Sequence, residues 1–181
     1  MNRALLVIDV QNEYFTGKMP ITYPENSFKN VLKAIDEANS KCIPVILIQH
    51  TAPQPDAKSF VKGSQGWELH TEILKREHAC IIEKHLPGSF TDTNLEMYLR
   101  EKAIETVVIC GYMTQMCCDT TARQAVHMGL SVEFLSDATG TLNVTNSAGS
   151  ITAEELHKAV LITQAMRFSK VMSTDEWMGT L

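Results

Sequence analysis

The 181-residue sequence lacks the marks of a nucleic-acid-binding, membrane-spanning or disulfide-stabilised protein. It has no basic stripe, and its net charge of -5 argues against nucleic acid, whose phosphates require concentrated Lys and Arg. No apolar run reaches the length of a membrane span, and Asp9 interrupts the N-terminal run too early for a signal peptide. Its 5 cysteines, an odd number, do not suggest a disulfide framework. We therefore expect a soluble cytoplasmic protein that binds neither nucleic acid nor membrane.

Repeats, linkers and low-complexity segments are also absent, so we expect residues 1–181 to form a single domain. Short apolar runs alternate with helical patterns along the whole chain, which is typical of a parallel sheet covered by helices. The sequence therefore predicts a three-layer αβα fold, with a six-stranded, mostly parallel sheet and helices on both faces. The expected strands are 4–8, 44–48, 79–82, 106–110, 130–135 and a weaker 168–172; the expected helices are 28–39, 67–74, 93–102, 114–128 and 152–167.

Polar and reactive side chains follow the predicted strands. Ligands of open parallel sheets bind beyond the carboxyl ends of the strands, so these side chains are candidates for one common site. They are Asp9, Gln11 and Asn12; Gln49 and His50; Lys84 and His85; Gly111 with Cys117 and Cys118; and Asp137.

Cys117 and Cys118 fall in the first turn of the helix expected from about Thr114. Unpaired backbone N–H groups and the helix dipole favour a thiolate there, and the thiolate is the nucleophile. The two side chains point about 100° apart around a helix, so both cannot enter one pocket. The position by itself marks a candidate nucleophile without choosing between the two.

Three segments resemble the isochorismatase-like cysteine hydrolase family. They are the opening ALLVIDVQNEY; a lysine motif running from Lys84 through Gly88, Ser89, Phe90, Thr93 and Leu95 to Leu99; and GYMTQMCCDTTARQA, which begins at Gly111. The resemblance spans almost the whole chain, and it implies a Rossmann-type isochorismatase-like fold. It places the family's catalytic triad on Asp9, Lys84 and Cys117, and it makes Cys118 a core residue.

The resemblance also implies the roles of these residues. Cys117 would attack a carbonyl carbon to form a thioester, and Asp9 would take the thiol proton and later give it to the leaving amine. Lys84 would lower the pKa of the thiol and hold Asp9 in its charged form. The backbone N–H groups of Met113 and Cys117 would form an oxyanion hole, preceded by a cis peptide between Tyr112 and Met113.

Family members include amidases, so we expect hydrolysis of a small carboxamide or ureido C–N bond. The variable loop 51–66 would act as a lid or set specificity, because long ordered loops are often functional. The candidate substrate-binding residues are Gln11, Tyr14, Phe15, Trp67, Phe90 and Tyr112.

We expect no metal and no organic cofactor. Nicotinamidases of this family bind a metal through an Asp-x-His pair after the second strand, whereas here IQHTAPQP leaves His50 alone. Family members usually form dimers or higher homo-oligomers, and we expect the same here. Two alternatives remain open. One is isochorismatase chemistry, in which Asp9 cleaves a vinyl ether, and the other is a non-catalytic thiol, redox or binding role for Cys117 and Cys118.

Overall fold

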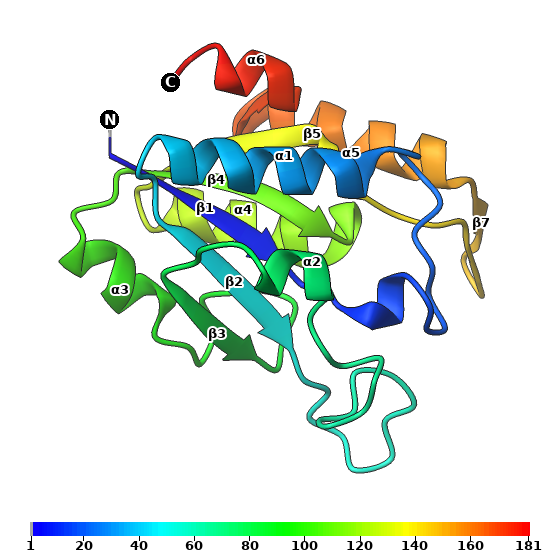
Figure 1. The fold of residues 1–181 in the computed structure, drawn as a ribbon. Helices are drawn as coiled ribbons and strands as arrows, with labels where there is room; N and C mark the ends of the chain where they lie inside the picture. The colour runs from blue at the N-terminus through cyan, green and yellow to red at the C-terminus, as the bar shows by residue number, and fades with distance from the viewer. Residues whose placement is uncertain (1) are drawn as a thin grey trace.

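A six-stranded parallel sheet runs through the middle of the molecule in the computed structural model, which describes residues 2–181 (Figure 1). The strand order is β3-β2-β1-β4-β5-β8, and all five pairings are parallel. The predicted six-stranded parallel sheet is therefore confirmed. The strands are β1 (Arg3–Ile8), β2 (Val45–His50), β3 (Cys80–Lys84), β4 (Thr106–Tyr112), β5 (Ser131–Gly140) and β8 (Lys170–Met172).

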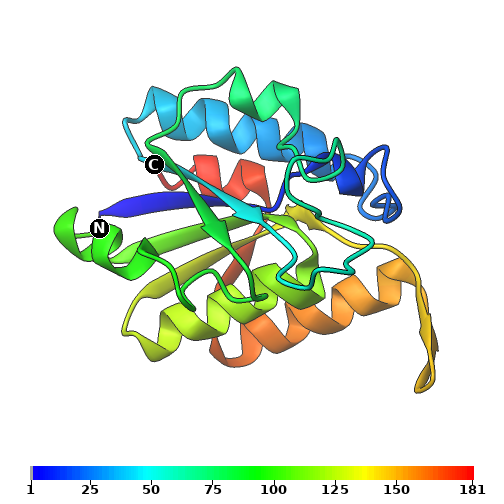
Figure 2. The same ribbon diagram turned by 90° about the horizontal axis from the view of Figure 1, so that it is seen from below.

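Helices cover both faces of the sheet (Figures 1 and 2). One face carries α1 (Ser27–Ser40), α2 (Thr71–Leu74) and α6 (Thr174–Met178), and the other carries α3 (Leu95–Glu101), α4 (Asp119–His127) and α5 (Ala153–Arg167). Side chains of a strand alternate between faces, so Leu5 and Val7 pack in the first core cluster, and Leu6 and Ile8 in the second. The three-layer architecture is therefore confirmed. None of the helices in residues 2–181 combines the length and the apolar character needed to cross a bilayer.

The strand order places the topological switch point between β1 and β4. From β1 the chain winds outward through β2 and β3, and it then crosses back to β4 on the other side. Loops diverge at such a point and leave a crevice beyond the carboxyl ends of the two strands. Asp9 directly follows β1, and the turn that leads to Cys117 directly follows β4.

Gly111 fixes how closely β1 and β4 approach at this point. It pairs with Ile8 in the register of the two strands and has a φ of 110°, a conformation that residues with a Cβ rarely adopt. A Cβ atom added to Gly111 would lie 2.1 Å from the carbonyl oxygen of Ile8. Only glycine therefore fits, and the contact ties the end of β4 to the residue before Asp9.

Two local predictions were wrong, and one hairpin was not predicted. The helix expected over 67–74 is only α2, because a turn occupies the first part of that range. The fifth strand continues to Gly140, so Asp137 lies inside β5, and its Oδ1 accepts hydrogen bonds from the backbone and hydroxyl of Thr174. Asp137 therefore supports α6 and does not reach the site. The hairpin of β6 (Val144–Asn146) and β7 (Gly149–Ile151), which projects from the body in Figure 1, was missed.

Candidate active site

Three side chains from different elements meet at the carboxyl edge of the sheet. The Nζ of Lys84, the last residue of β3, lies 2.8 Å from Oδ2 of Asp9. The same Nζ donates a hydrogen bond of 3.2 Å to the Sγ of Cys117. The side chains of Asp9 and Lys84 are both 0% exposed, so this ion pair is fully withdrawn from water. The structure thus brings together the three residues of the predicted triad, whose catalytic roles stay predictions.

Asp9 is held by its backbone in an unusual conformation. Its φ is 50°, in the left-handed region that few non-glycine residues occupy, although Asp is among those that tolerate it. Its N–H donates to the carbonyl of Ile48 at 3.0 Å, and its own carbonyl accepts from Gln11 at 2.8 Å. Neither carboxylate oxygen accepts a well-aligned hydrogen bond from a described residue, so the 2.8 Å contact with Lys84 is an ion pair with poor hydrogen-bond angles. The carboxylate therefore keeps capacity to accept a proton.

Cys117 lies in a single π-helical turn, η2 (Thr114–Cys118), which continues directly into α4. Such turns are rare and occur frequently at functional sites. The peptide bond between Tyr112 and Met113, just before this turn, is cis, which confirms that expectation. Cys117 therefore sits where the chain leaves the sheet, beside the crevice between β1 and β4.

The pKa of the Cys117 thiol is raised, contrary to the prediction from its position near a helix start. Burial is the largest cause, and the neighbouring Asp9 carboxylate adds to it. Lys84 lowers the pKa of the thiol as predicted, but burial and Asp9 outweigh it. Burial also lowers the pKa of Lys84, but Asp9 and Cys117 more than offset this and raise it overall, so Lys84 is charged. The resting site therefore holds a protonated thiol beside a carboxylate.

Cys118 faces away from this group. It is fully buried and packs in the second core cluster with Leu6, Ile109 and Ala122. Burial raises the pKa of its thiol well above the ordinary value. The pKa of the Cys117 thiol is raised as well, so the two thiols differ in their partners: the Sγ of Cys117 accepts a hydrogen bond from Lys84, whereas Cys118 packs among apolar side chains.

Lys84 has two further partners that sequence reasoning did not connect to it. Its Nζ donates to the carbonyl of Leu86 at 3.2 Å and lies 3.5 Å from Nδ1 of His50. Burial, followed by the charge of Lys84, lowers the pKa of His50, so its imidazole is neutral at pH 7. His50 closes β2, next to β3, and this pairing of strand ends was the only sequence signal for the contact.

A second histidine supports the turn that carries Cys117. The Nε2 of His157, on α5, lies 2.8 Å from the carbonyl of Ser136, which can only accept, so Nε2 carries the proton. Burial lowers the pKa of His157, and its Nδ1 therefore accepts from the hydroxyl of Thr114 at 2.8 Å. This link between α5, β5 and η2 was missed, because His157 follows no predicted strand.

The six candidate substrate-binding residues lie in different surroundings, and their contact with substrate stays a prediction. Gln11 is fully buried. Its side-chain amide forms hydrogen bonds with the backbones of His50 and Trp67, so it holds these two segments together and leaves no group free for substrate. The other five divide between the two faces. Tyr14 and Tyr112 lie in the first core cluster, Phe15 packs against it, Phe90 lies in the second beside Cys117, and the partly exposed Trp67 donates to Thr51.

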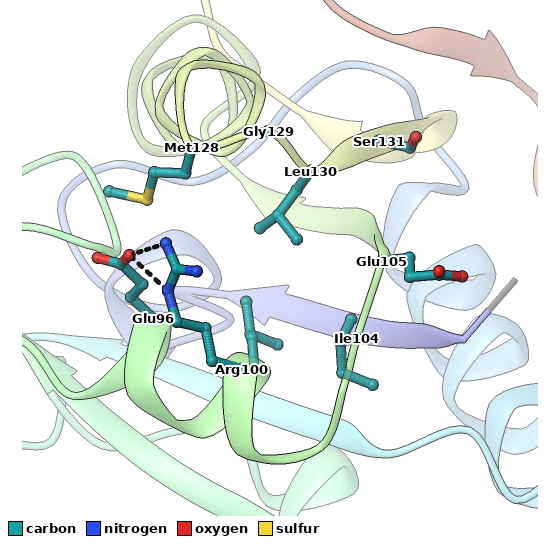
Figure 3. A pocket seen from close by; sticks show the side chains of 9 residues that line it. Glu96, Arg100, Ile104, Glu105, Met128, Gly129, Leu130 and Ser131 are labelled. Atoms are coloured by element: carbon teal, nitrogen blue, oxygen red, sulfur yellow. Dashed lines mark hydrogen bonds and ion pairs between the residues drawn. The ribbon is translucent and has the colours of Figure 1, made fainter.

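Two cavities of the described residues open away from Asp9, Lys84 and Cys117. A cavity of about 460 Å³ opens between α3 and the residues that begin β4 and β5, where Glu96 and Arg100 form an ion pair (Figure 3). A second cavity of about 440 Å³ lies between the β6–β7 hairpin and Gln115 and Met116 of η2. Within residues 2–181 no three His, Cys, Asp or Glu side chains cluster closely enough to hold a metal ion. The metal-independent site and the homo-oligomer stay predictions.

Comparison with known proteins identifies the family. The model of the isochorismatase domain matches residues 3–176. The chain belongs to the isochorismatase family. It is 34% identical over 179 residues to the uncharacterised isochorismatase family protein YddQ of Bacillus subtilis, covering 98% of this chain and 99% of that protein. It is 31% identical to Nicotinamidase 3 of Arabidopsis thaliana, with 96% and 85% covered.

Solved structures of the isochorismatase family have the same fold. A candidate isochorismatase from Burkholderia xenovorans LB400 superposes with a TM-score of 0.96 at 45% sequence identity. The superposition covers 99% of this chain and 86% of that one. The chain is therefore an isochorismatase-family hydrolase, and amidases are among its relatives.

Proposed function

We propose that this protein is a cysteine-dependent hydrolase of a small carboxamide or ureido C–N bond. The observation that carries the proposal is the position of Lys84, buried within 2.8 Å of Asp9 and 3.2 Å of Cys117. An acid, a cation and a thiol are costly to bury together, and such groups cluster at sites of chemistry. Nicotinamidase 3, a relative that matches almost the whole chain, is by name an amidase.

In the proposed reaction, Asp9 takes the proton of the Cys117 thiol as Sγ attacks the carbonyl carbon of the substrate. A raised thiol pKa is compatible with this order, because the base removes the proton during the attack. The backbone N–H groups of Met113 and Cys117 stabilise the oxyanion of the tetrahedral intermediate. Asp9 then gives the proton to the leaving nitrogen, and the C–N bond breaks to leave a thioester on Cys117.

Water completes the cycle. Asp9, ionised again, takes a proton from a water molecule that attacks the thioester carbonyl, and the C–S bond breaks as Asp9 gives this proton to Sγ. The products are a carboxylic acid, or a carbamic acid from a ureido group, and the free thiol. Lys84 stays protonated throughout and offsets the negative charge that moves among Asp9, Sγ and the oxyanion. Its burial strengthens this effect, because water does not screen the charges.

The test is ammonia release from a panel of small amides and ureido acids, with hydroxylamine added to trap a thioester as a hydroxamate. Cys117→Ala should lower ammonia release by at least about 10³-fold and abolish the hydroxamate. Cys118→Ala is the matched control, and it should retain both. An acyl adduct that survives in Cys117→Ala but disappears in Cys118→Ala would move the nucleophile to Cys118.

Isochorismate turnover separates the proposal from vinyl-ether chemistry, which requires an acid and no thiol. If no amide yields ammonia and Cys117→Ala still cleaves isochorismate, Asp9 is acting without Cys117 and the amidase proposal fails. Loss of both activities on Asp9→Asn alone would not distinguish the two reactions, so the cysteine variant decides.

A further inference from the structure

Lys84 has more hydrogen-bond acceptors around it than it has protons to donate. Four acceptor atoms lie within 3.5 Å of its Nζ, whereas an ammonium group carries three N–H bonds. They are Oδ2 of Asp9 at 2.8 Å, the carbonyl of Leu86 at 3.2 Å, Sγ of Cys117 at 3.2 Å and Nδ1 of His50 at 3.5 Å. Three of these contacts are hydrogen bonds, and the ion pair with Asp9, whose hydrogen-bond angles are poor, draws on the same ammonium group.

The protonation state of Cys117 decides how strongly Sγ competes with Nδ1 of His50 for the protons of Lys84. A thiol is a weak acceptor, whereas a thiolate is a strong one, so the 3.2 Å hydrogen bond from Lys84 to Sγ strengthens once the thiol proton has left. Neutral His50 offers a lone pair on Nδ1 whenever its proton sits on Nε2. The imidazole of His50 is positioned by its place at the end of β2 and by an edge-on contact with the ring of Phe60, whose centroid lies 5.2 Å away.

We propose that His50 is a positioning residue for Lys84. Its Nδ1 accepts the third N–H while Cys117 carries its proton, and this N–H turns to Sγ when the proton leaves. The inference rests on the proposed function, because it concerns the thiolate that would attack the substrate. It assigns to His50 a role in holding the ammonium group between two states of the nucleophile, with no contact to substrate required.

In the proposed reaction, the neighbours of Lys84 that change protonation are Cys117 and Asp9. Ionisable groups lie around the site on each element packed against it: Asp9 after β1, Tyr14 in η1 (Asn12–Tyr14), His50 at the end of β2, His85 after β3, and Cys117 with the core residue Cys118 in η2. Burial raises the pKa of Tyr14 well above its ordinary value, so its hydroxyl stays neutral. A change confined to His50 therefore acts on Cys117 through Lys84.

The experiment measures the rate at which iodoacetamide alkylates Cys117 between pH 6 and 10, followed by peptide mass. In this reaction Sγ displaces iodide and the thiol proton passes to solvent, so no substrate is required. His50→Asn keeps an acceptor close to the position of Nδ1, and His50→Leu has the same branching without one. We expect the wild-type profile in His50→Asn. In His50→Leu the thiol loses its proton more readily, so alkylation at a fixed pH should be roughly three- to tenfold faster.

Equal profiles in the Asn and Leu variants, or slower alkylation in the Leu variant, would overturn the inference. If His50→Leu does not fold, His50→Phe provides a second variant without an acceptor and can pack against Phe60. The two proposals fail separately. Identical alkylation profiles with persisting ammonia release reject the role of His50 alone, whereas shifted profiles without ammonia release from any amide reject the hydrolase alone.

Discussion

The two edges of the sheet differ in whether their ion pairs are exposed to solvent or buried. At the amino edge, the ion pair of Glu96 and Arg100 borders a roomy cavity and leaves 42% and 70% of the two side chains exposed. At the carboxyl edge, Asp9 and Lys84 are 0% exposed. Exposed ion pairs cost little to form and contribute little, whereas buried ones require desolvation that good geometry must offset. The size of a hollow is thus a weaker sign of chemistry here than the burial of charge.

The largest contrast should be in catalysis. Asp9→Asn removes the proposed general base, and we expect kcat/KM for the best amide substrate to fall roughly 10²–10⁴-fold. Glu96→Gln removes a carboxylate of the other edge and should leave kcat/KM within twofold of wild type, about the precision of such assays. Steady-state ammonia release measures both. A similar loss in the two variants would show that the edges do not differ in function.

The next contrast is in stability. Lys84→Met leaves the Asp9 carboxylate buried without a partner, and the free energy of unfolding should fall by about 3–5 kcal/mol. Arg100→Met breaks the exposed pair and should cost about 0–1 kcal/mol. Urea denaturation followed by circular dichroism measures both values. If Lys84→Met is as stable as Arg100→Met, loss of the buried partner of Asp9 costs no more than loss of an exposed ion pair, and the expected difference in the free energy of unfolding is wrong.

A smaller loss in the free energy of unfolding is expected at His157, a neutral side chain that supports the turn at the carboxyl edge. His157→Gln keeps a donor for Ser136 but has no acceptor at the position of Nδ1, where Thr114 donates, which should cost about 1–2 kcal/mol at pH 7.5. Burial lowers the pKa of His157, so between that lowered value and the ordinary 6.5 the unfolded chain binds more protons than the folded one. The contribution of His157 is therefore complete above pH 6.5 and is lost as the pH falls.

The stability of wild type should accordingly drop more steeply than that of His157→Gln between pH 7 and 5. Because burial also lowers the pKa values of His50 and His70, only the difference between wild type and variant reports on His157. Parallel curves for the two proteins would contradict the assignment of His157 as a neutral acceptor.

Much of the fold could be predicted because its central strands are buried on both faces. Continuous apolar runs such as those of β1 and β2 are the sequence signal of such strands. The end of β5 was misjudged because Ser136 and Asp137 interrupt its apolar run, although pairing with β4 continues as far as Gly140. The β6–β7 hairpin gave no signal, because most of its residues are exposed and no core face imposes an alternation on them.

The positions of Asp9, Lys84 and Cys117 could be predicted because the ends of parallel strands converge. Their electrostatics could not. A cysteine near a helix start predicts a lowered thiol pKa, yet the degree of burial and the presence of Asp9 reverse the sign. Nor does a sequence show that His50 lies within reach of Lys84, or His157 within reach of Thr114, because those contacts depend on where side chains point.

The missing side chain at Gly111 has a consequence for how such a protein can evolve or be redesigned. It lets β4 approach β1 so closely that the residues after Ile8 and after Gly111 share one crevice. A substitution there would wedge the strands apart and alter the spacing between Asp9 and Cys117 before it altered anything else. A mutational library aimed at new substrates should therefore spare this position. The exposed hairpin of β6 and β7 offers variation that leaves the reacting groups in register.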